Sequence, residues 1–188
     1  MSRFNILVLG IVVVLIGVFV MGAGYVSAPS VPPQDDTTPS YSSAEYGISF
    51  SYPEGYVLTE KDLPGSAQRK HHVITLMRSA DLPLPEAGEG PPSITIDVYQ
   101  NNLDSLSTEA WVRNSSQSNF KMGDGRLAST TVSGLPALSY RWSGLYEGTT
   151  IALAQPRWVY ALTVTYLEMG ADIVQDFVVV RDSVRIAQ

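Results

Sequence analysis

The stretch ALSYRWSGLYEGTTIALAQPRWVYALTVTYL, residues 137–167, decides the fold of this chain. Apolar and aromatic residues recur in it at every second position, which is the period of a β-strand with one buried face. Two short connections, Glu147-Gly148 and Gln155-Pro156, interrupt the alternation. Because short connections favour hairpins, we expect consecutive strands that pair antiparallel, over residues 137–146, 149–155 and 157–167.

The same alternation occurs elsewhere in the chain. Ile48 and Phe50, for example, alternate with Gly and Ser, and Pro53-Glu54-Gly55 then predicts a turn. The segments between the expected strands are polar or rich in Pro and Gly, as loops are. The further strands are expected over residues 46–52, 56–59, 72–79, 93–99 and 127–132.

Two segments favour helices. Residues 107–118 follow a capping serine, Ser107 or Ser105, and carry Glu109 in the first turn. Residues 171–186 place one apolar stripe at helical spacing, and although the valines at 178–180 also permit a strand, the stripe continues beyond them. Because strands outnumber helices and the hairpins are sequential, we expect an α+β fold, an antiparallel sheet with helices packed on it. The stripe consists of Ile173, Phe177, Val180 and Val184.

The N-terminal segment predicts one transmembrane helix. Ile6–Ala28 carries no charge and is long enough to span a hydrocarbon core of about 30 Å. Arg3 precedes it and Asp35 and Asp36 follow it, which predicts a cytoplasmic N-terminus and a C-terminal domain outside. Val26-Ser27-Ala28 fits a signal-peptide cleavage site. We favour an uncleaved anchor, because proline would follow the cut and the apolar run is long; cleavage would give a secreted domain.

These patterns divide the chain into three parts. Residues 1–28 are the membrane anchor or signal segment. Residues 29–45, PSVPPQDDTTPSYSSAE, lack apolar periodicity and are expected to be a linker. Residues 46–188 are expected to form the α+β domain.

Charge and cysteine content exclude several classes of function. The net charge is -6, from 12 basic and 18 acidic residues, and an acidic domain repels nucleic acid. The chain has no cysteine, which excludes disulfides, thiolate zinc sites, a cysteine nucleophile and a lipoprotein anchor. No motif for a cofactor is present, and we predict none.

The order of the elements and several local sequences resemble the PsbP-like family of extracytoplasmic domains. The resemblance implies a twisted antiparallel sheet between helices. It also implies a non-enzymatic accessory or assembly role, as in extrinsic photosystem subunits and membrane-attached bacterial relatives, and it implies no catalytic residues. It is carried by YGISFSYPEGY at 46–56, GLPA at 134–137, YALTVTY at 160–166 and the closing helix with Phe177.

One set of aromatic residues is the candidate ligand site. Tyr140, Trp142, Trp158 and Tyr160 lie in the expected hairpins, with Tyr166 nearby, and could line a ligand groove. Aromatic residues at strand period also build cores, and the sequence leaves both interpretations open.

Other candidate chemistry is weaker. His71 and His72 could bind a metal with Asp62, Asp97 or Glu60, but adjacent strand residues point to opposite faces, so no metal site is predicted. The Ser118-x-x-Lys121 sequence lacks the partner motifs of penicillin-recognising serine enzymes.

Three functions therefore stay open. The first is a membrane-anchored accessory or binding domain that acts on an envelope protein partner. The second is an envelope hydrolase whose carboxylates come together only in the fold. The third is a passive structural spacer.

Overall fold

The structure of the chain, a computed structural model, describes residues 38–64, 69–84 and 86–187. The predicted transmembrane helix and the first part of the predicted linker lie outside the described residues. Within these ranges no helix has the length and apolar character needed to cross a bilayer.

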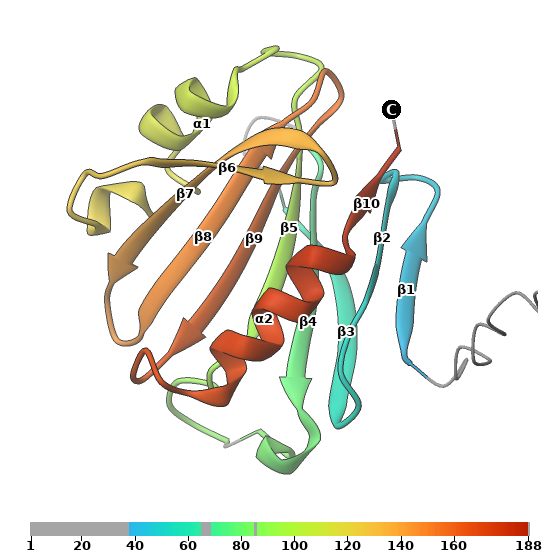
Figure 1. Cartoon of the computed structure of the whole chain (residues 1–188), viewed down its shortest axis with the longest axis vertical. Coiled ribbons are helices and arrows are strands. Elements are labelled where there is room, and N and C mark those ends of the chain that lie inside the picture. The colour runs from blue at the N-terminus through green and yellow to red at the C-terminus, as the bar shows by residue number, and fades with distance from the viewer. Residues whose placement is uncertain (1–37, 65–68, 85, 188) are drawn as a thin grey trace, which may run out of the picture. The chain divides into compact units, whose positions relative to one another are not determined.

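A seven-stranded sheet forms the centre of the domain, in the order β3-β4-β5-β9-β8-β7-β6 (Figure 1). All neighbouring strands pair antiparallel. The predicted hairpins of residues 137–167 are confirmed, since β7, β8 and β9 are consecutive neighbours. The strands are β3 (Tyr56–Leu63), β4 (His71–Arg78), β5 (Ile94–Gln100), β6 (Ala128–Val132), β7 (Leu135–Ser143), β8 (Glu147–Ala154) and β9 (Trp158–Tyr166).

A second, three-stranded sheet contains β1 (Ser40–Ser43), β2 (Ile48–Ser51) and β10 (Arg185–Ile186) in the order β1-β2-β10. β1 lies within the range predicted as linker, so the last part of that prediction is wrong. The sequence there lacks apolar periodicity, but β1 pairs with β2 along its whole length, and the ring of Tyr41 stacks on Phe50 at 5.3 Å.

The two predicted helices are confirmed, but the first ends at Asn114 instead of reaching residue 118 as expected. Helix α1 (Thr108–Asn114) is capped by Ser107, whose hydroxyl accepts a hydrogen bond from the Ala110 amide at 3.2 Å. Helix α2 (Asp172–Ser183) ends earlier than predicted, because the chain after it becomes extended and pairs with β2 as β10. Two short 3₁₀ turns, η2 (Ser79–Asp81) and η3 (Phe120–Met122), complete the elements.

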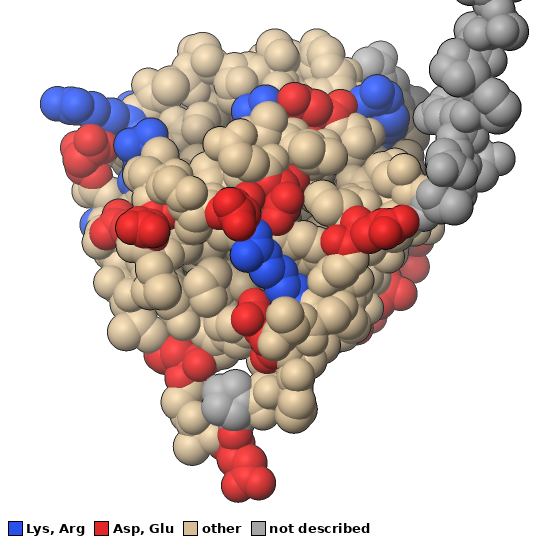
Figure 2. Space-filling model, turned by 60° about the horizontal axis from the view of Figure 1, so that its bottom comes forward, with Lys and Arg blue, Asp and Glu red and all other residues tan. Residues whose placement is uncertain are grey.

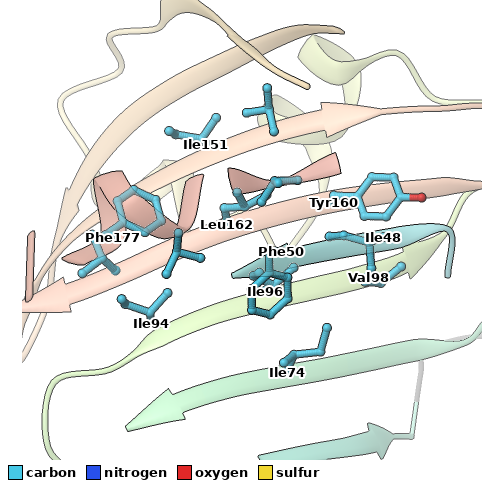
Figure 3. Packing of buried hydrophobic residues seen from close by; sticks show 14 of the residues in the cluster. Ile48, Phe50, Ile74, Ile94, Ile96, Val98, Ile151, Tyr160, Leu162 and Phe177 are labelled. Atoms are coloured by element: carbon cyan, nitrogen blue, oxygen red, sulfur yellow. The ribbon is translucent and has the colours of Figure 1, made fainter. Parts of the chain in front are cut away.

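Strand alternation gives the large sheet two different faces. One face, called here the α2 face, is covered by α2 and the small sheet, and it holds the main core (Figure 3). The other, the α1 face, packs against α1 and η3 around Trp111, Val112 and Phe120. The sheet therefore lies between helices, as predicted, with the small sheet as an addition. The labelled core residues of Figure 3 are Ile48, Phe50, Ile74, Ile94, Ile96, Val98, Ile151, Tyr160, Leu162 and Phe177.

Candidate functional site

The four predicted aromatic site residues lie on opposite faces of the sheet. Tyr140 and Trp142 belong to the α1 face, and Trp158 and Tyr160 to the α2 face. The strand register explains the separation: Tyr140 of β7 lies opposite Thr150 of β8, which lies opposite Thr163 of β9. The odd-numbered residues of β9 therefore share the face of Tyr140, and the even-numbered aromatic residues point the other way.

Three of the four aromatic residues are buried in the cores. The Tyr160 hydroxyl donates to the Tyr46 carbonyl at 2.7 Å, and Trp158 packs edge-on against Tyr46. The Tyr140 hydroxyl donates to the Ser118 carbonyl. Trp142 differs, because it is half-exposed and lines a cavity.

That cavity is one lobe of a groove on the α1 face, called here the α1 groove. The first lobe, about 300 Å³, lies between the ends of β4 and β5 and the C-terminal end of α1. The second lobe, about 250 Å³, lies over β5, β9, β8 and β7. The lobes adjoin, since His71, Tyr99 and Gln117 line both.

His71 and Asp97 form a pair in the middle of the α1 groove. The His71 Nε2 atom lies 2.7 Å from Asp97 Oδ1, and the imidazole stacks on the ring of Tyr99 at 4.2 Å. The Tyr99 hydroxyl also donates to Asp97 Oδ1, at 3.4 Å. Burial, and then the charge of Asp97, raise the pKa of Tyr99, so its hydroxyl stays a neutral donor.

Trp142 is held in one orientation beside this pair. Its indole lies flat on Gly148 of β8, where an added Cβ would come within 2.2 Å of the indole Cε2 atom. The indole Nε1 donates to the Thr150 hydroxyl at 3.0 Å, and this hydroxyl lies 2.9 Å from that of Thr163. The indole N–H already has a hydrogen-bond partner within the protein. Trp142 therefore contributes an aromatic ring to the lining of the groove.

The charged groups of the first lobe are paired. Arg69 lies 2.6 Å from Asp104, and Lys70 lies 2.8 Å from Glu45. Asn101, which is buried, fixes the loop before α1 through hydrogen bonds to the backbone of residues 106 and 155. The Arg69 Nε atom, by contrast, is buried and has no hydrogen-bond partner among the described residues.

His72 lies on the face opposite His71, as the sequence predicted. Its Nδ1 is 2.8 Å from Asp62 and its Nε2 is 3.3 Å from Glu60, and its ring stacks on Tyr46 at 4.2 Å. The hydrogen bond from His72 holds the pKa of Asp62 below its ordinary value. Among the described residues no group of three His, Asp or Glu side chains could hold a metal ion.

Ser118 is part of the structure of the loop after α1. Its side chain is buried, and its hydroxyl donates to the Val112 carbonyl at 2.6 Å. The hydroxyl of the Ser118-x-x-Lys121 sequence is therefore engaged with backbone rather than presented to a ligand.

Exposed leucines gather at the end of the sheet opposite α1, called here the apolar end. The loop from η2 to β5 carries Leu84, the β7–β8 turn Leu145, and the β9–α2 turn Leu167 and Met169. A hydrogen bond of 2.7 Å from Tyr146 to the Gly90 carbonyl joins two of these connections.

The apolar end is acidic at its margins. Figure 2, which brings this end of the domain forward, shows acidic side chains at many places with basic side chains among them. The three connections contain no Lys or Arg, and Arg78, which lines a small cavity with Leu167, is paired with Asp176 at 3.0 Å. Sequence reasoning missed this surface, although leucines in turns, outside any strand alternation, were a signal. The acids of these connections and the residues next to them are Asp81, Glu86, Glu89, Glu147, Glu168 and Asp172.

Comparisons with known proteins identify the fold. No family model matches the chain, and no curated protein matches it. The chain is similar to the solution structure of cyanobacterial PsbP (CyanoP) from Synechocystis sp. PCC 6803, with a TM-score of 0.50 and 12% sequence identity. The match covers 79% of this chain and 91% of that chain. This chain has a PsbP-like fold.

Proposed function

We propose that the protein is a membrane-anchored accessory domain outside the cytoplasm that binds an envelope protein partner and catalyses no reaction. The observation that carries the proposal is the apolar end, where exposed Leu145 and Leu167 stand among acids. Large exposed apolar side chains with polar margins are typical of protein-binding surfaces. Because the margin is acidic, we expect the partner to present an apolar surface with basic residues around it.

The anchoring half of the proposal rests on sequence. The uncharged run Ile6–Ala28 is long enough to cross a bilayer, and the acids that follow it favour export of the domain. A tethered domain meets partners in the same membrane at a raised effective concentration, so a small docking surface suffices.

The PsbP-like fold supports the accessory role through the family resemblance, which implies non-enzymatic members. The α1 groove and the apolar end have no lining residue in common, although Trp142 and Thr165 of the groove lie close in the chain to Leu145 and Leu167. Exposed side chains of the apolar end can therefore be changed without replacing a groove residue.

The alternative, an envelope hydrolase, requires a pair of carboxyl groups with separated pKa values. Glycoside hydrolysis, for example, places two carboxyl groups on either side of the scissile bond. Asp97 is the single acid among the described residues that line the second lobe, and it is paired with His71. The pKa of Asp62 is lowered, and its side chain is 78% exposed, opposite to what a general acid needs.

Site-specific photo-cross-linking in membranes of the source cells tests the proposal. A photoreactive residue at Leu145, which is 67% exposed, is compared with one at Leu103, which is 62% exposed and lies beyond the other end of the sheet. We expect one recurrent membrane-protein adduct from position 145, none from position 103, and loss of the adduct when Leu167→Asp is added. Equal labelling at both positions, or an adduct that Leu167→Asp leaves unchanged, contradicts the proposed surface.

A further inference from the structure

We propose that the α1 groove binds a neutral polyhydroxylated ligand, a sugar ring of a glycan, with Trp142 as the stacking surface and Asp97 as the acceptor of its hydroxyl groups. The groove shares no lining residue with the apolar end, so this inference does not depend on the proposed protein partner.

Trp142 is held in one orientation in the α1 groove. The indole is pressed against Gly148 and tied to Thr150 through its Nε1, so it is ordered before any ligand arrives. Because the N–H is already bonded, the ring can add only its apolar surface to a ligand. The C–H groups on one side of a sugar ring pack on such an aromatic surface, and a fixed ring loses little entropy on binding.

Three polar side chains near the indole have unused hydrogen-bonding groups. Among contacts within the described residues, the side chains of Thr95, Gln117 and Asn119 make no hydrogen bond. A hydroxyl and two amides offer donors and acceptors at short range, as a ligand with several hydroxyl groups requires.

Asp97 adds a directed acceptor. The Asp97 Oδ1 atom is hydrogen-bonded to His71 Nε2 and to the Tyr99 hydroxyl, whereas Oδ2 has no hydrogen bond to a described residue. A carboxylate oxygen held in place by two neighbours, with the second oxygen open, is suited to accept a hydroxyl donor.

The charges and hydrogen-bonding groups of the groove suit a neutral polar ligand. Arg69 lies beside Asp104, Lys70 reaches Glu45, and His71 is bonded to Asp97, so a neutral ligand leaves these contacts intact. The Arg69 Nε atom is buried and has no hydrogen-bond partner among the described residues, so it offers one more donor to a hydroxyl group. Ligand pockets usually have volumes of about 300–1,000 Å³. The first lobe, at about 300 Å³, lies at the lower limit of this range, and the second, at about 250 Å³, is slightly smaller.

Calorimetric titration of the full-length chain tests this inference. The protein is purified in a detergent without a sugar headgroup, because a glycoside detergent would compete for the groove. The probes are neutral oligosaccharides of glucose, mannose, galactose and N-acetylglucosamine. We expect at least one of them to bind, with affinity weakened tenfold or more by Trp142→Leu and roughly threefold to tenfold by Thr95→Val.

Control variants separate recognition from folding. Gln175→Ala changes an exposed amide on α2, on the opposite face of the sheet, and is expected to bind as the wild type does. Thr95→Val keeps the side-chain shape, so it reports on the groove even where Trp142→Leu disturbs the fold. Co-sedimentation with insoluble envelope polysaccharide distinguishes a wall glycan, which would carry the protein down, from a free sugar, which would bind only in solution.

Two results overturn the inference. One is that no oligosaccharide of the panel binds the wild-type chain at millimolar concentration. The other is that the Trp142→Leu and Thr95→Val variants bind as tightly as the wild type.

Discussion

The two faces of the central sheet are built from the same strands but differ in composition. On the α2 face, Ile94, Ile96 and Leu162 are fully buried under α2 and the small sheet. On the α1 face, the neighbours of these residues in the chain, Thr95 and Thr163, line a groove. Because successive side chains of a strand point to opposite faces, one sheet can bury an apolar core on one side and carry a polar groove on the other.

Truncation of a core residue on the α2 face should have the largest effect. Phe177→Ala is expected to lower the free energy of unfolding by about 3–5 kcal/mol, because Phe177 is buried in the main core. Urea unfolding followed by circular dichroism measures the loss. Thr163→Ala, the control on the α1 face, should cost much less, and equal losses would remove the distinction between the faces.

Overpacking beneath Trp142 should have an intermediate effect. Gly148→Ala is expected to cost about 1–3 kcal/mol, since the new Cβ would lie 2.2 Å from the indole and would force the ring away. The same variant should shift the emission maximum of the tryptophan fluorescence and abolish the binding of any ligand in the α1 groove. Unchanged fluorescence would mean that the indole does not lie on Gly148.

Alkaline pH should weaken the junction between the small sheet and the α2 face. Burial, followed by nearby carboxylates, raises the pKa of Tyr41 and of Tyr46 from 10.0 to about 12. Their contribution is complete below pH 10 and is lost as the pH rises through 12, because the unfolded chain loses these protons first. Unfolding midpoints measured from pH 8 to 12 should fall in the wild type and fall less in Tyr46→Phe. An equal fall in both would contradict the role of Tyr46.

The smallest effect is expected for Asp62, the exposed carboxylate that is hydrogen-bonded to His72. Asp62 has a lowered pKa, so its contribution is present above the ordinary value of 3.8 and is lost as the pH falls through the folded value. Asp62→Asn should therefore lower the unfolding midpoint slightly at neutral pH and leave it unchanged at strongly acidic pH. A difference that persists in strong acid would show that the hydrogen bond between His72 and the ionised Asp62 is not its cause.

Local sequence pattern was enough to predict most of the elements. The alternation in residues 137–167 is strong because each strand buries one face, and the Ser107 cap and the stripe of α2 are equally local signals. β1 was missed because its stability comes from pairing with β2 and from contacts of Tyr41 with Phe50 and Glu60, none of which the local sequence reveals.

The candidate site was predictable only in part. Trp142 was among the predicted residues, but the face of each aromatic residue depends on the register between strands, which separated Tyr140 from Tyr160. Asp97 and His71 lie 26 positions apart and meet through the pairing of β4 with β5. No spacing rule connects such a pair, so the groove could be recognised only in the folded chain.

The most direct measurement is an NMR titration of the full-length, ¹⁵N-labelled chain with the oligosaccharide that binds best. We predict that the indole N–H signal of Trp142 shifts together with amides of the α1 groove, while that of Trp158, on the α2 face, stays in place. Equal shifts of both signals, or shifts confined to the α2 face, would contradict the assignment of recognition to one face and stability to the other.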